Sequence, residues 1–86
     1  MKVLEKILKS VANKRRLEIL KLLKHNKELS VGEIAEKINL SLKSTSRHLG
    51  VLFGADMIEK DQRSLQVFYR LAKIEKHFLK SILSEL

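Results

Sequence analysis

Two helix start signals lie close together in the middle of this chain of 86 residues, and they constrain its fold more than any other feature. Ser30 and Glu33 have the spacing of a capping box, in which the serine hydroxyl and the glutamate satisfy each other's free amides. Ser41 can cap a second helix. Only a short helix, predicted over 31–38, fits between the two signals. Two helices joined by so short a turn form a helix-turn-helix, predicted here over 31–54.

Apolar residues at three- and four-residue spacing predict a helix on each side of this unit. One helix is expected over 2–11, and another follows Asn13 as far as about His25. The helical period returns after the middle of the chain and predicts a last helix over 73–85.

Between the helix-turn-helix and the last helix, the pattern changes to that of β-strands. "MIEKD" and "QVFYRL" are β-prone and partly alternating, and "QRSL" between them carries turn residues. We therefore predict a hairpin of 57–61 with 66–71, which makes a wing over 57–71. The order α-α-α-α-β-β-α describes a mainly α, winged helix-turn-helix protein, with one domain over 1–86.

The charge balance favours a polyanionic partner. Eighteen Lys and Arg against ten Asp and Glu leave a net charge of +8. Each cation that neutralises a DNA phosphate releases a condensed counterion, which favours binding. The alternative is that lysine-rich helices only keep the chain in solution.

The absence of some features reduces the range of possible functions further. The chain has no cysteine, which excludes disulfides and thiolate metal sites. No apolar run approaches the ~20 residues that cross a bilayer, and the first residues do not resemble a signal peptide. We expect a cytoplasmic protein that does not enter a membrane.

The stretch "LSLKSTSRHLGVL" at 40–52 has too few apolar residues for a helix that only fills a core. At helical spacing, Lys43, Ser46, Arg47 and Gly50 share one face, opposite the apolar positions. A recognition helix in the major groove, about 12 Å wide, presents such residues to base edges and phosphates. Gly50 would let the helix come close to the duplex. An exposed polar helix without a partner is the alternative.

Two further positions have more than one reading. Arg63, at the expected wing tip, could enter the minor groove or contact a phosphate, and the alternative is a solvated turn. His48 could bond to a phosphate or pack under the helix. The complete set of DNA-contacting candidates is Ser41, Lys43, Ser44, Ser46, Arg47, His48, Gln62 and Arg63.

The chain resembles the ArsR family of arsenical-resistance repressors, from "ANKRRLEILKLL" to "QVFYRL". The most specific part is "SVGEIAEKINLS" followed by "STSRHLGVL". The resemblance implies a homodimer, paired through its first and last helices, that blocks transcription by occupying operator DNA. It makes the following residues dimer contacts, for which packing within one subunit is the alternative: Leu4, Ile7, Val11, Ile74, Phe78 and Ile82.

Four departures from the family pattern affect what the resemblance implies. Metal-sensing members carry cysteines where this chain has "ELSVGEI", so that site is absent. Asp56 replaces a usual glycine after the recognition helix, which predicts a positive φ at a residue that disfavours it. Ser64 and Leu65 replace a glycine and an arginine of the wing, and Gly50 replaces a long polar residue.

Neither a metal site nor an enzyme is predicted. Glu75 and His77 resemble half of a zinc site of some family members, but no second half is found before residue 86. There is no glycine-rich phosphate loop, cysteine nucleophile or grouping of Ser, His and acid by spacing. We expect no cofactor.

These observations predict a homodimeric regulator that binds double-stranded DNA at a pseudo-palindromic operator, acting as a repressor. A winged-helix module that binds another protein is the main alternative. A basic protein on a membrane surface is a third, which the hairpin and the turn signals oppose.

Overall fold

The computed structural model of the protein describes residues 5–6, 8–9 and 13–73. The helices predicted over 2–11 and 73–85 lie largely outside these residues. So do all six predicted dimer contacts, Leu4, Ile7, Val11, Ile74, Phe78 and Ile82. The pairing of two subunits through these segments stays a prediction.

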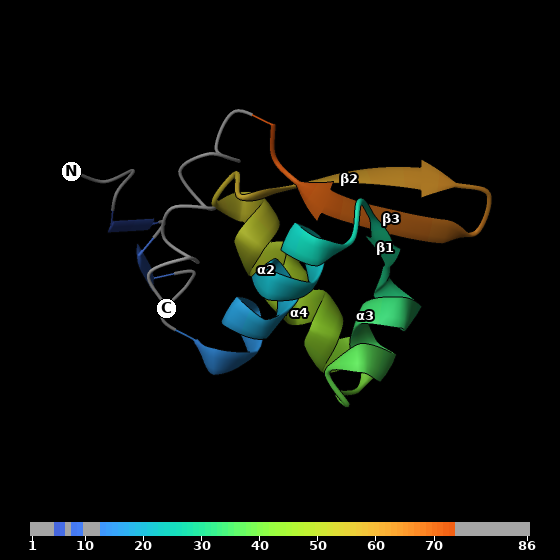
Figure 1. Ribbon diagram of the computed structural model, residues 1–86, viewed down its shortest axis with the longest axis horizontal. Helices are drawn as coiled ribbons and strands as arrows, with labels where there is room; N and C mark the ends of the chain where they lie inside the picture. The colour runs from blue at the N-terminus through green and yellow to red at the C-terminus, as the bar shows by residue number, and fades with distance from the viewer. Residues whose placement is uncertain (1–4, 7, 10–12, 74–86) are drawn as a thin grey trace.

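The described residues form a winged helix-turn-helix, which confirms the predicted fold (Figure 1). The helices and strands are, in chain order, α2 (Lys14–His25), β1 (Leu29–Ser30), α3 (Val31–Lys37), α4 (Leu42–Gly54), β2 (Ile58–Arg63) and β3 (Gln66–Leu71). All neighbouring strands are antiparallel, in the order β1-β3-β2. None of the described helices is long and apolar enough to cross a membrane.

The three predicted helix caps are present. The Asn13 side chain accepts a hydrogen bond from the Arg15 amide at 2.9 Å. Ser30 and Glu33 make both bonds of the capping box, at 3.2 and 2.9 Å, and these bonds lower the pKa of the Glu33 carboxyl. The Ser41 hydroxyl accepts from the Ser44 amide at 3.1 Å. The start of each described helix is therefore set by a local side-chain signal.

Two details of the sheet were predicted wrongly. No strand was predicted between the helix that ends at about His25 and the cap at Ser30, but Leu29 and Ser30 form β1, which pairs with β3. A strand of two residues is too short to show an alternating pattern. Gln62 and Arg63 were expected at the turn, but β2 continues through Arg63, and only two residues connect the strands.

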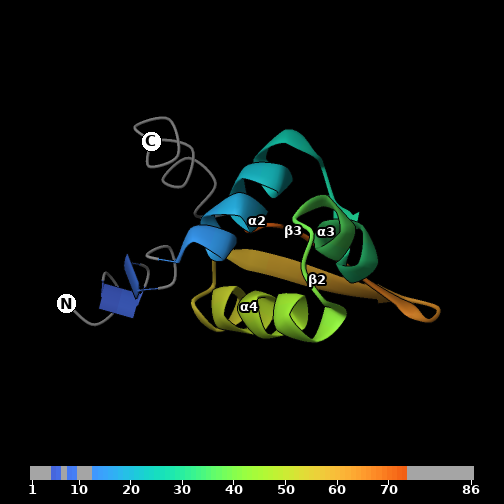
Figure 2. The ribbon, with the colours of Figure 1, turned by 90° about the horizontal axis from the view of Figure 1, so that it is seen from below.

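The hydrophobic core lies where α2, α3 and α4 converge below the sheet (Figures 1 and 2). Its most deeply buried side chains come from α2, α3 and α4 and from the residue before the hairpin, namely Ile19, Leu20, Ile34, Leu49, Leu52 and Met57. The core thereby fixes the orientation of α4, because one face of that helix is fully enclosed.

Three chain reversals carry a residue other than glycine at positive φ. These are Asn39 after α3, Asp56 after α4 and Ser64 at the tip of the hairpin, with φ of 54°, 59° and 58°. The positive φ predicted for Asp56 is confirmed. Such a conformation costs an ordinary residue roughly 1–2 kcal/mol, and glycine removes this cost.

We expect Asp56→Gly to raise the free energy of unfolding by about 0.5–1 kcal/mol, because the relief of strain exceeds the added entropy of the unfolded chain. Asp56→Ala is the matched control and should lower it, since alanine tolerates positive φ less well than aspartate. Denaturant unfolding of the three proteins measures both effects. A glycine variant less stable than the aspartate protein would show that the carboxylate itself holds the helix end.

Candidate nucleic-acid interface

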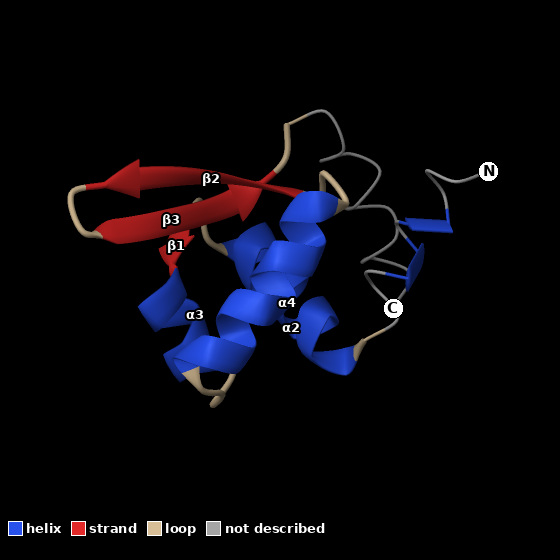
Figure 3. Ribbon diagram, turned by 180° about the vertical axis from the view of Figure 1, so that it is seen from behind, coloured by secondary structure: helices blue, strands red, loops and turns tan. Residues whose placement is uncertain are grey.

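The two faces of α4 differ sharply in burial. Thr45, Leu49 and Leu52 are fully buried. Figures 2 and 3 agree that α4 lies on the other side of the molecule from α2, with its outer face uncovered by described elements. On that outer face Lys43, Ser46, Arg47 and Gly50 are all exposed, as the helical period predicted.

The cations of this outer face have no partner within the described part of the protein. The protein has five arginines, and all but one donate hydrogen bonds to its own carbonyls or carboxylates. These four are Arg15, Arg16, Arg63 and Arg70. In the described residues, Arg47 makes no hydrogen bond or ion pair, and neither does Lys43. Because α4 also contains no acidic residue, both cations are available to an external anion.

Small residues and the helix start complete the surface. Ser41 and Ser46 are exposed and Ser44 is half-buried, so short side chains surround the two cations. The Ser44 amide near the start of α4 is capped by Ser41, whereas the amides before it have no carbonyl partner in the helix, which suits a phosphate. A Cβ at Gly50 would meet no atom of the described residues within 4 Å, so packing against these residues does not require glycine there. The glycine costs helix stability and leaves room for a close approach from outside.

His48 is half-buried, and its imidazole is neutral at pH 7. Burial is the main cause of its lowered pKa, and the positive charges of Arg16, Arg47 and Arg15 lower the pKa further. A neutral ring can donate an N–H to a phosphate or pack under the helix, but it adds no positive charge to the surface.

We expect His48 to make the protein less stable on acidification between pH 7 and 5. The unfolded chain takes up the proton near the ordinary pKa of 6.5, whereas the folded protein resists it until a lower pH. The contribution is therefore complete above pH 7 and falls as the pH drops below 6.5. His48→Gln should reduce this slope, measured by denaturant unfolding at several pH values. Equal slopes in the two proteins would contradict the lowered pKa.

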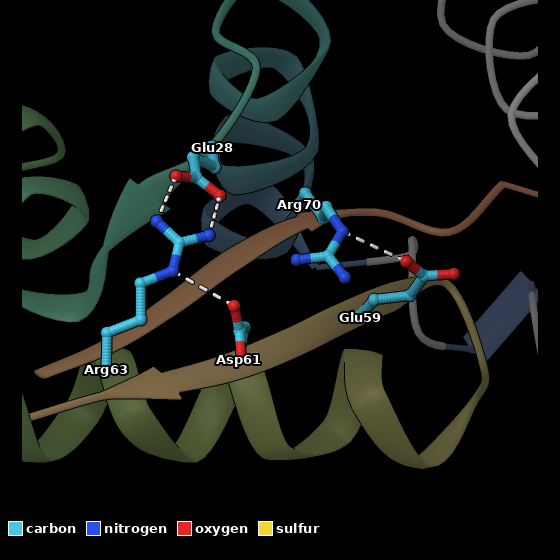
Figure 4. A network of polar contacts seen from close by, with 5 residues as sticks. All are labelled: Glu28, Glu59, Asp61, Arg63 and Arg70. Carbon is cyan, nitrogen blue, oxygen red and sulfur yellow. Dashed lines mark hydrogen bonds and ion pairs between the residues drawn. The ribbon is translucent and has the colours of Figure 1, made fainter.

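The wing places its two candidate residues on opposite faces. Strand alternation puts Gln62 on the face toward α4, where Lys60 lies over the Phe53 ring with its ammonium 4.4 Å from the ring centre. Arg63 is on the other face (Figure 4). Its guanidinium donates two hydrogen bonds to Glu28, at 2.5 and 2.8 Å, and one to Asp61 at 3.0 Å.

The contacts between Arg63 and Glu28 shift the pKa of each group in the direction that keeps it charged. The hydrogen bonds from Arg63 lower the pKa of the Glu28 carboxyl, and those carboxylates raise the pKa of Arg63. Sequence reasoning missed Glu28, because a residue 35 positions away gives no local signal of this contact. It also gave no role to Leu65, which is 97% exposed at the tip.

The start of α4 and the tip of the hairpin point toward the same end of the molecule (Figure 2). Ser41, Lys43, Ser46 and Arg47 are thus brought together on α4, with the wing tip at the same end. No group of three or more potential metal ligands occurs among the described residues, and His77 lies outside them.

Comparison with known proteins supports one assignment. Residues 13–60 match the family described as bacterial regulatory protein, arsR family. The chain is 41% identical to the transcriptional activator HlyU of Vibrio cholerae over 69 residues, which are 80% of this chain and 63% of HlyU. It is 34% identical to the transcriptional repressor SdpR of Bacillus subtilis over 76% of this chain and 71% of SdpR.

Solved structures agree with this match. The structure of HlyU from Vibrio cholerae covers 93% of this chain, and this chain covers 87% of it, with a TM-score of 0.84 at 36% identity. The homodimeric winged helix-turn-helix DNA-binding domain of Mb0332 from Mycobacterium bovis has a TM-score of 0.89 at 26% identity, covering 96% of this chain and 77% of that domain. The chain therefore belongs to the arsR family of bacterial regulatory proteins.

Proposed function

We propose that this protein is a homodimeric transcription regulator that binds double-stranded DNA through the outer face of α4. The observation that carries the proposal is a pair of cations, Lys43 and Arg47, that have no partner among the described residues and lie on a helix without carboxylates. A buried or ion-paired arginine would have to give up its partners to bind DNA, but these two side chains already project into solvent. The family itself is one of regulators.

Two parts of the molecule would contact DNA, the start of α4 and the wing tip. The amino-terminal part of α4 would enter the groove, where Arg47 and Lys43 can donate to guanine or phosphate. The wing tip, at the same end of the molecule, would lie over the neighbouring minor groove. The proposed contact surface consists of Ser41, Lys43, Ser44, Ser46, Arg47 and Gln62, with His48 as a neutral donor beside it.

A homodimer would read a pseudo-palindromic operator, because two related subunits would meet two related half-sites. Mb0332 is described as homodimeric, and we propose that two copies of this chain also pair, through the helices predicted over 2–11 and 73–85. The half-sites would then lie about 10–11 base pairs apart, or a multiple of this. The related proteins include both an activator and a repressor, and we propose repression by occupancy of the operator, in the bacterial cytoplasm.

Selection of bound fragments from random duplexes, followed by titration at several salt concentrations, tests the proposal. Two cations from each of two subunits should give a slope of log affinity against log salt steeper than about −3. The selected sites should show two-fold symmetry. A protein-binding module would instead show weak duplex binding with no preferred sequence, and that result would reject the proposal.

A further inference from the structure

The hairpin face remote from α4 holds a network of charges in which Arg63 is central (Figure 4). Besides its three hydrogen bonds to Glu28 and Asp61, the Arg63 guanidinium lies 4.8 Å from the centre of the Phe68 ring. Two carboxylates thus face one guanidinium, and the ring covers it. Paired forks of this kind between arginine and a carboxylate have defined geometry.

The network joins two parts of the molecule that must both be in place to hold DNA. Arg63 is the last residue of β2 and borders the wing tip. Glu28 immediately precedes β1, and Ser30 at the end of β1 is the cap of α3. The contact between Glu28 and Arg63 therefore ties the end of the wing to the residues that start the helix-turn-helix.

Resting on the DNA-binding function proposed above, we propose that Glu28 and Arg63 form a clip that positions the wing. Arg63 keeps this role in the DNA complex and does not neutralise a phosphate. If the guanidinium moved to DNA, Glu28 and Asp61 would be left unpaired and negative near the phosphates, which opposes the move. The wing then reaches DNA with the uncharged side chains of its tip, which include the almost fully exposed Leu65.

Operator titrations over a range of salt concentrations separate a clip from direct binding to a phosphate. Arg63→Gln should weaken binding roughly three- to tenfold, because the wing must be ordered on binding. It should leave the salt slope unchanged. Arg47→Gln, measured in parallel, should make the slope shallower by about 0.9 for each phosphate that residue 47 no longer neutralises. If Arg63→Gln changes the slope as Arg47→Gln does, or has no effect on affinity, the clip is rejected.

Variants of the partner give a second, independent result. Glu28→Gln should weaken binding as much as Arg63→Gln, and the double variant should be no weaker than either one. Glu59→Gln is the matched control, because it removes the same charge from the same face while its partner is Arg70. Tighter binding by Glu28→Gln than by Glu59→Gln would show that Glu28 competes with DNA for Arg63, and would overturn the proposal.

The NMR signal of the Arg63 Nη–H groups reports the clip directly, because these groups donate to Glu28. It should be protected in the free protein, persist when operator DNA is added, and be lost in Glu28→Gln. Loss of the signal on adding DNA to the unchanged protein would overturn the clip. If Arg47→Gln leaves both the affinity and the salt slope unchanged, the proposed function itself fails, whatever Arg63 does.

Discussion

Replacing Arg47 with alanine should weaken operator binding by roughly 5- to 150-fold per half-site, or about 1–3 kcal/mol, and leave the fold unchanged. The side chain is exposed, and in the described residues it makes no hydrogen bond or ion pair that the protein would lose. Almost all of the effect should therefore appear in the complex. In a dimer the loss applies to both half-sites, which makes it one of the two largest effects we expect.

The measurement is a fluorescence-anisotropy titration of labelled operator, repeated from low to moderate salt, with the thermal midpoint of the free protein as the check on folding. If Arg47 binds a phosphate, the salt slope becomes shallower by about 0.9 per phosphate. If it donates to a base edge, discrimination between operator variants at that position decreases instead. Lys21→Ala, on the exposed side of α2, is the control for loss of charge alone. An effect of the same size in both variants would show that Arg47 contributes only its charge and makes no specific contact with DNA.

The helices α2, α3 and α4 could be predicted from the sequence because their signals are local. Ser30, Glu33 and Ser41 act on amides three residues away, and the period of the helix decides which side chains of α4 face outward. The positive φ at Asp56 could also be predicted, since the resemblance to the arsR family implies a glycine at this helix end. The exposed face of α4 could be predicted residue by residue, because the helical period alone determines it.

The sheet could be predicted only in part, because its details depend on pairing between distant residues. β1 exists because Leu29 and Ser30 meet β3 at Tyr69 and Phe68, some 40 positions later, and two residues carry no pattern of their own. The position of Arg63 depends on the register of the hairpin. A shift by one residue would turn its side chain to the face of α4.

This dependence on register explains why the wing residue was the hardest part of the site to predict. From the sequence, Arg63 was a free cation beside a turn. In the structure it pairs with Glu28 and Asp61, and no local rule connects it with Glu28. Arg47, in contrast, belongs to a helix whose own period determines its exposure. A cation on a helix face can thus be assigned from sequence with more success than one on a hairpin.

Leu49→Ala should lower the stability of the fold, whereas Arg47→Ala should lower only the affinity for DNA. The reason is that Leu49 is a fully buried side chain at the centre of α4. Truncation of a buried leucine to alanine costs about 2–5 kcal/mol through reduced burial and the cavity left behind. For a domain of this size, each kcal/mol corresponds to roughly 4–8 °C in the thermal midpoint. Because small domains are only about 5–15 kcal/mol stable, the variant should lie near the limit of folding.

Leu42→Ala is the matched control for this substitution, because it makes the same chemical change on the same helix where the side chain is 58% exposed. It should shift the midpoint little. All three proteins must be compared at one protein concentration, since the midpoint of a dimer depends on it. Saturating operator DNA should return part of the stability that Leu49→Ala removes, about 2.7 kcal/mol at a hundredfold excess over Kd, because DNA binds only the folded state. The salt slope should then equal that of the unchanged protein, since the cations on the outer face remain. A Leu49 variant that keeps its midpoint but loses operator affinity would mean that the buried and exposed faces of α4 have been assigned the wrong way round.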